Sequence, residues 1–364
     1  MVSSVNLIVI LVIVDTTLLI CLYIIIRPNT PNHGANMTSV ICWKNENSLW
    51  IVSDSRINQS ASSVLNNLSP KIFTLPVKVG FNEDPWLAPI EISTVGFSFS
   101  GNTLIANITK DLLQLLLSNL KLMNHDTNNF STKSILEEQL SKKIDQTKKS
   151  NISKEIFHIA TSKLIENNYS YLDEKPSLEE IANLAKDILT QTIISYYNPF
   201  NMSGSEPSVE ILIFGYCEKN LRNESFKLRY TPEMTSPEEI KCIQHSFDSE
   251  EYCILGDRIE YVREKIQTKR VQTKNRLVSD RAPLYVLNEI IDSEQKSGSI
   301  GGHLQLAVCG ENGVHIKGFT DDQLNFSFCG VNPYFREDGT TILRALGKFV
   351  ILPPVMVYPS EKDE

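Results

Sequence analysis

Apolar and polar positions alternate in short runs over the first third of the chain. Two such runs, Val40 to Trp43 and Leu49 to Ser53, flank the polar turn KNENS and predict a β-hairpin. Two further strands are expected at Lys71 to Leu75 and at Ser93 to Asn102. Residues 103–123 follow directly and carry apolar side chains at helical spacing on a broad face, which predicts a long helix.

The second half of the chain repeats this layout. Its expected strands are 209–216, 225–230, 251–257, 303–310 and 313–319, and its expected helices are 258–267 and 282–294. Strands, helices, strands, helices and strands in this order predict an α+β fold. Two antiparallel sheets would pack face to face, with the helices outside them.

A polar stretch separates the two halves. From about residue 124 to 175 the chain is rich in Asn, Ser and Lys, which indicates an insertion containing an exposed helix near residues 134–148. The sequence SLEE follows, in which Ser177 as N-cap and Glu180 three residues later form a capping box. A helix is therefore expected to begin there.

The chain begins with an apolar segment, Leu7 to Ile26, which is long enough to cross a bilayer and contains one charge, Asp15. It has no basic n-region and no clear small-residue cleavage site, so residues 1–27 are predicted to be an N-terminal apolar helix acting as a signal anchor. Arg27 on its C-terminal flank places the rest of the chain in the cytoplasm. Residues 28–37 are predicted to be a linker or propeptide. The alternative is that translation starts at Met37, which gives a soluble cytoplasmic protein.

Composition excludes several functions. Hydrophobic residues make up 41% of the 364 residues, charged residues 21%, and the formal net charge is −8, without a basic block. These values are typical of a globular protein and argue against a nucleic-acid partner. The seven cysteines form no C-x-x-C pair and have no His at ligand spacing, so no metal site and no cofactor are predicted.

Several motifs in the same order carry a resemblance to a known family. The run MTSVICWKNENSLWIVSDSR, then KIF, then VGFSFSGN resembles the start of a proteasome β-type subunit. It is similar to the bacterial proteasome-related peptidase of the HslV type, and ILIFGYCEKN and GSIGGHLQLAVCGENGV resemble later strands of that family. The resemblance implies an N-terminal-nucleophile hydrolase with a four-layer αββα sandwich over residues 38–364.

The resemblance implies a catalytic set. Asp54 follows Thr38 by sixteen residues, as in the family, and Lys71 follows one residue later than the commonest spacing. Thr38 would be the nucleophile, with its own freed α-amine, of pKa about 8, as the base. A charged Lys71 would keep that amine neutral, Asp54 would hold Lys71, and the N–H of Gly101 would stabilise the oxyanion. Taken singly, these are an ordinary strand Thr, turn acid, solvated base and helix-entry glycine.

A substrate pocket is carried over by register. Along VGFSFSG the strand period of two places Phe99 on the same face as Gly101, so Phe99 would floor the pocket for the residue before the cut. The other expected wall positions are Ile57, Ser69, Phe73 and Thr103. None is charged, which predicts a preference for small or medium apolar residues. The alternative is that Phe99 points into the core and never meets substrate.

Two departures from the family pattern bear on activity. Asp257 follows Gly256 where the family usually has Ser, and Ile300 stands before Gly301-Gly302 where it has another Ser. Ser297 occupies the position of the family's Asp. Substitutes for these groups would be Ser299 and, more distantly, Asp292.

The leading hypothesis is a threonine-type peptidase or amidase that needs removal of the residues up to Met37. The alternative is a catalytically silent proteasome-like scaffold or assembly protein tethered to a membrane. Expected partners are a peptide or protein substrate, copies of the chain in a homo-oligomeric ring, an ATP-dependent unfoldase and the membrane.

Overall fold

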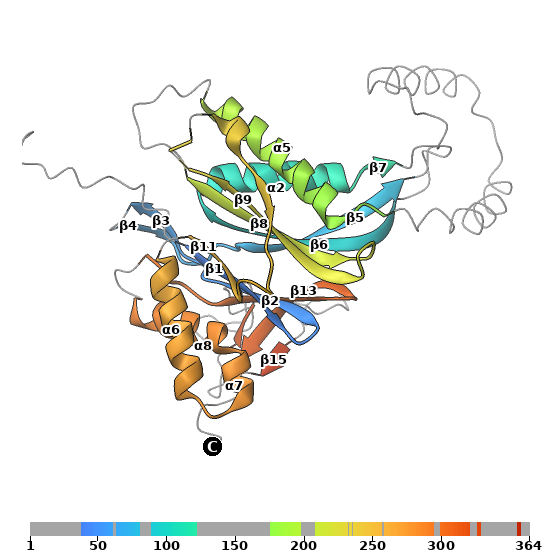
Figure 1. Cartoon of the computed structure of the whole chain (residues 1–364). Coiled ribbons are helices and arrows are strands. Elements are labelled where there is room, and N and C mark those ends of the chain that lie inside the picture. Colours follow the sequence, from blue (N-terminus) through green and yellow to red (C-terminus); the bar gives the residue numbers. More distant parts are fainter. Residues whose placement is uncertain are drawn as a thin grey trace, which may run out of the picture.

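The computed structural model describes residues 38–60, 63–80, 89–121, 175–197, 208–231, 233–234, 236–256, 258–294, 299–320, 326–328 and 355–357. Within these residues the fold is mixed, with two large sheets that are antiparallel except for the β13–β15 and β5–β7 pairs, and with helices outside them (Figure 1). This confirms the α+β class expected from the order of elements.

The seven-stranded sheet contains the first hairpin. Its order is β11 (Tyr252–Gly256), β1 (Ser39–Asn45), β2 (Ser48–Ser53), β12 (Gln305–Gly310), β13 (Gly313–Thr320) and β14 (Phe326–Ser327), with β15 (Val355–Val357) also paired to β13. Strand β11 therefore lies at an edge and contacts β1, the strand that starts just after Thr38.

The six-stranded sheet contains the apolar strand of the second half at its centre. Its order is β10 (Cys242–Gln244), β9 (Arg222–Tyr230), β8 (Val209–Cys217), β6 (Ile90–Gly101), β5 (Ile72–Gly80) and β7 (Leu120–Lys121). A separate two-stranded ribbon, β3 (Ile57–Ser60) with β4 (Ser63–Asn66), lies between β2 and β5 in the sequence.

The helices pack on the outer faces of the two sheets. In the part of the chain that the structure describes, the helices are α2 (Thr103–Leu117), α5 (Leu178–Tyr197), the 3-10 helix η2 (Pro237–Glu239), α6 (Ile259–Gln272), α7 (Arg276–Asp280) and α8 (Ala282–Ser293). Helices α2 and α5 cover the six-stranded sheet, and α6 and α8 lie against the seven-stranded one (Figure 1).

Three apolar clusters hold these layers together, and the strand period of two assigns side chains to them. On β1, Ile41 and Trp43 point toward α6 and α8, whereas Val40 and Cys42 point into the layer between the sheets. Phe214 of β8 meets them there from the other sheet. Each strand of the first hairpin is thus buried on both faces.

Local signals predicted most elements, and tertiary pairing changed a few. The capping box is confirmed, since the Ser177 N–H donates to Glu180 Oε2 at 2.7 Å and the Glu180 N–H to Ser177 Oγ at 3.2 Å. The helix expected to reach residue 123 ends at Leu117, because Leu120 pairs with Val79 of β5 instead. Helix α7 and the β3–β4 ribbon were not predicted.

Some predictions lie outside the described residues. These are the linker 28–37, the insertion over residues 124–174 with its helix near 134–148, and the apolar run 7–26. The boundaries drawn from them stay predictions.

The predicted membrane-anchored location is contradicted. Within the described ranges no helix is both long and apolar enough to cross a bilayer. The longest helix there, α5, has 20 residues but carries Glu179, Glu180, Lys186 and Asp187, and its apolar side chains serve the core over the six-stranded sheet.

The packing of Phe214 against its cross-strand neighbour Gly96 yields a stability prediction. A Cβ on Gly96 would lie 2.1 Å from the ring of Phe214, which is fully buried in the inter-sheet cluster. We expect Gly96→Ala to lower the free energy of unfolding by about 1–3 kcal/mol, because the ring cannot move without disturbing that cluster. Urea denaturation would measure it. Gly310→Ala is the matched control, since nothing lies within 4 Å of its added Cβ. Equal effects of the two changes would contradict the prediction.

Candidate active site

The fold brings Thr38, Asp54 and Lys71 together. Thr38 immediately precedes β1 and Asp54 immediately follows β2, and these strands form an antiparallel hairpin whose ends coincide. Lys71 immediately precedes β5 of the other sheet. Its Nζ lies 2.8 Å from Thr38 Oγ1 and 3.1 Å from Asp54 Oδ1. Asp54 and Lys71 are fully buried, and Thr38 is 7% exposed.

The Asp54 carboxylate is held mainly by backbone donors. The N–H of Ser39 donates to Oδ1 at 3.1 Å, and those of Arg56 and Gly301 donate to Oδ2 at 3.2 Å each. With the Lys71 ammonium as fourth donor, both oxygens are satisfied without water. Asp54 is thereby fixed in position relative to Lys71 and to the first strand.

Burial lowers the pKa of Lys71 from the ordinary lysine range. The largest cause is desolvation, which the neighbouring Asp54 carboxylate opposes, while the charge of Arg56 adds to the lowering. The ammonium also donates to the backbone carbonyl of Arg56. An amine of lowered pKa that donates to a Thr hydroxyl is suited to proton exchange with that hydroxyl.

Gln305 also orders this site, and the sequence did not single it out. Its Oε1 accepts from the Lys71 N–H at 2.9 Å, and its Nε2 donates to the Ser69 carbonyl at 2.7 Å. It is 1% exposed at the start of β12. A buried glutamine opening an apolar strand was the available signal, because such an amide must find partners.

Gly101 lies at the end of β6, where only glycine fits. Its φ is +98°, and a Cβ would lie 2.3 Å from the Ser208 carbonyl oxygen. That carbonyl accepts from the Asn102 N–H at 2.8 Å, just before α2 begins. The preceding residue, Ser100, contacts Thr38 directly, because its Oγ donates to the Thr38 carbonyl at 3.1 Å.

The expected pocket residues divide into two groups. Phe99 and Phe73 stack, with ring centroids 6.4 Å apart and planes 9° apart. Phe99 is 1% exposed in the cluster beneath the helices, whereas Phe73 is partly buried. Ile57 at the start of β3, Ser69 before β5 and Thr103 at the start of α2 are half-buried.

The sequence missed a cation beside Phe73. Lys110 Nζ lies 4.3 Å from the centroid of the Phe73 ring and 3.0 Å from Asp111 Oδ1. The spacing from Thr103 along α2 was a signal available for it, since residues seven apart share a helix face.

The positions that depart from the family pattern are only partly described. Ile300 is 1% exposed and packs in the cluster under α8, and the Ser299 carbonyl accepts from Asn58 Nδ2 at 2.9 Å. Asp292 is exposed on α8, where its Oδ2 accepts from Asn288. Ser297 and Asp257 lie outside the described residues.

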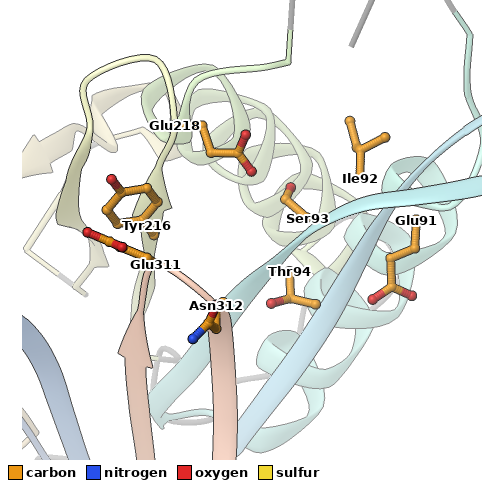
Figure 2. Close-up of a pocket in the computed structure, with 9 residues that line it drawn as sticks. Glu91, Ile92, Ser93, Thr94, Tyr216, Glu218, Glu311 and Asn312 are labelled. Carbon is orange, nitrogen blue, oxygen red and sulfur yellow. The ribbon is translucent and has the colours of Figure 1, made fainter. Parts of the chain in front are cut away.

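A separate pocket lies at the opposite end of β6 (Figure 2). Its volume is about 260 Å³, and its lining residues are Glu91, Ile92, Ser93, Thr94, Tyr216, Glu218, Glu311, Asn312 and Gly313. Thr94 and Ser100 are six residues apart on one strand, which separates their ends by about 20 Å. This pocket is therefore not part of the Thr38 site.

Comparison with known proteins gives matches among solved structures only. No family model matches the chain, and no curated protein does. Similar solved structures are an Anbu mutant from Hyphomicrobium sp. strain MC1 (13% identity, 75% of this chain, 82% of that one, TM-score 0.41), Anbu, an ancestral beta-subunit, from Yersinia bercovieri (14%, 75%, 81%, 0.41), and a helical assembly of the Anbu complex from Pseudomonas aeruginosa (13%, 75%, 81%, 0.42).

The resemblance to the HslV type is corrected, since the three similar structures named here are Anbu proteins. At this identity and TM-score, nothing about activity or assembly passes from these proteins to this chain.

The lowered pKa of Lys71 predicts a pH-dependent stability. The native state gives up this proton at a lower pH than the unfolded chain, so between the two pKa values the unfolded state binds more protons and stability rises with pH. We expect the free energy of unfolding of the wild type, relative to Lys71→Met, to increase from about pH 7 to about pH 10. Urea denaturation at both values would measure it, with Lys44→Met, an exposed position, as the control. A relative decrease over this range would contradict the prediction.

Proposed function

We propose that the chain is a threonine-type amidase, acting on peptide or protein substrates, with the architecture of a four-layer N-terminal-nucleophile sandwich. The observation that carries this proposal is the buried contact of Lys71 Nζ with Thr38 Oγ1 and Asp54 Oδ1. An unused strand threonine has no need of a buried ammonium on its hydroxyl, because burying that charge costs free energy.

The proposed reaction begins once residues up to Met37 are removed. The freed α-amine of Thr38 takes the proton of Oγ1, and Oγ1 attacks the carbonyl carbon of the scissile amide. Lys71 beside the hydroxyl favours the neutral amine and stabilises charge that develops on Oγ1. The N–H of Gly101 is the proposed donor to the oxyanion. The amine then protonates the leaving nitrogen, and water resolves the acyl-enzyme.

A second candidate is a catalytically silent relative. Ile300 stands where the family carries a Ser and is buried against α8, so its side chain offers no hydrogen bond to the nucleophile. Against this, the backbone N–H of the next residue, Gly301, does reach Asp54.

Assembly into a homo-oligomer and pairing with an ATP-dependent unfoldase are further proposals for the active form.

The terminus and the catalytic set give one prediction. We expect a large fraction of native protein to begin at Thr38 by intact mass, and that fraction to hydrolyse a peptide amide and react with an electrophile selective for N-terminal Thr. Thr38→Ala should abolish both activities, and Lys71→Ala should lower kcat at least about 100-fold. Thr38→Ser, which keeps a hydroxyl, should retain activity. Hydrolysis that survives Thr38→Ala, or protein that begins only at Met1 or Met37, would refute the proposal.

The pocket gives another prediction. We expect a preference for small or medium apolar residues before the cut, since none of the expected wall positions is charged and the Lys110 charge is paired with Asp111. Phe99→Leu should shift the preference toward larger residues in a positional scanning library. Phe97→Leu is the matched control, because Phe97 is equally buried in the same cluster but one strand repeat farther from Thr38. A preference for charged residues, or the same profile in both variants, would contradict this register.

A further inference from the structure

The edge strand β11 is closed by side chains of the other sheet. Strand β1 pairs with it at Ile41↔Ile254 and Ser39↔Gly256, so residues 254 and 256 are alternate positions with the same backbone orientation. The Gly256 N–H and the Ile254 carbonyl bind partners outside the pairing with β1. An edge with such free groups needs partners when it is buried.

Glu210 and Lys227 supply these partners. The Gly256 N–H donates to Glu210 Oε2 at 2.6 Å, and Lys227 Nζ donates to the Ile254 carbonyl at 3.4 Å. Lys227 Nζ also lies 2.8 Å from Glu210 Oε1, and Arg229 Nε lies 3.4 Å from the same oxygen. Side chains of two neighbouring strands of the six-stranded sheet, β8 and β9, thus bind the backbone at the edge of the seven-stranded sheet.

These contacts of Glu210 and Lys227 with β11 lie next to Thr38. Gly256 has a φ of +98°, and a Cβ on it would lie 1.7 Å from the Thr38 carbonyl oxygen, so the two backbones are in direct contact. Glu210 is also the direct cross-strand neighbour of Ser100, whose Oγ donates to that same carbonyl. The Thr38 carbonyl therefore accepts from Ser100 of one sheet and packs against Gly256 of the other, and Glu210 is next to both residues.

We propose that Glu210 is a positioning residue for Thr38, acting through Gly256, and that Lys227 holds the Glu210 carboxylate in place. Only the expected effect of Glu210 on the reaction rate rests on the proposed function. A nucleophile works within a fraction of an ångström of its productive position, and a shift of about 1 Å can cost about 100-fold in rate. Releasing the Gly256 N–H would loosen β11 and remove the backbone that packs on Thr38.

The pair differs from an ordinary surface ion pair. The Glu210 side chain is 8% exposed and the Lys227 side chain 23%, whereas that of Arg229 is 59% exposed. Removal of Lys227 should therefore disturb Glu210 more than removal of Arg229, because exposed ion pairs contribute little to stability.

The test compares full-length wild type with Glu210→Ala and Glu210→Gln, with the fraction that begins at Thr38 quantified by intact mass. Hydrogen exchange followed by mass spectrometry would report the Gly256 and Ser39 amides. We expect Glu210→Ala to speed exchange at both amides about tenfold or more, and to lower kcat at least about tenfold with KM within about twofold. Glu210→Gln keeps an acceptor oxygen for Gly256 and should fall between, which keeps the test valid if Glu210→Ala fails to fold.

Glu224→Ala is the matched control. Glu224 is buried to 3% exposure on β9 of the same sheet and pairs with Arg222, but it lies opposite Gly215, toward the far end of β8. It should leave exchange at Gly256 and kcat within about twofold of wild type. Unchanged exchange at Gly256 and Ser39 in Glu210→Ala would overturn the proposal, as would a kcat equal to that of Glu224→Ala. A wild type without activity would refute the proposed function alone, because the exchange at Ser39 would still decide the positioning role.

Discussion

The buried contact of the Lys71 ammonium with the Asp54 carboxylate is the interaction on which the rest of the site depends. The two groups come from different sheets and are both fully buried, so each is tolerable only in the presence of the other. Their separation of 3.1 Å therefore fixes how the sheets meet at this end. Thr38 takes its place from the same contact, because its hydroxyl accepts from the same ammonium.

Whether the sequence predicted a contact of this site depends on how far apart its two residues lie along the chain. The closeness of Thr38 and Asp54 follows from local pattern, since the residue before one strand of a hairpin and the residue after the other must lie at the same end. Lys71 belongs to the other sheet, and only the family spacing suggested it. Gln305 and Glu210 reach their partners across 234 and 46 residues, and no local pattern encodes such pairs. The predicted helix over residues 103–123 was too long for the same reason, because Leu120 pairs with Val79 of the strand β5.

Backbone groups perform much of the work that side chains perform elsewhere. Asp54 is held by three backbone N–H groups, and one of these comes from Gly301, where a Cβ would lie 2.1 Å from the Arg56 guanidinium carbon. Glycine at residue 301 therefore leaves room for the Arg56 guanidinium beside the backbone that contacts Asp54. This arrangement leaves the side chain of Ile300 to the apolar cluster under α8, while the chain beside it still supplies a polar contact to the site.

The layer between the sheets changes character along its length, and the site lies where it changes. Its middle is apolar, with Val40, Leu212 and Phe214 in one cluster, and mutual burial there favours close packing without fixing direction. At the Thr38 end the layer holds Ser100, Glu210 and Lys71, whose hydrogen bonds run to groups of the opposite sheet. Hydrogen bonds are directional and buried polar groups are costly when unpaired, so these contacts set the alignment that the apolar cluster leaves open. The alignment of the sheets and the placement of the Thr38 hydroxyl therefore depend on the same hydrogen bonds, and a change that loosens either one disturbs the other.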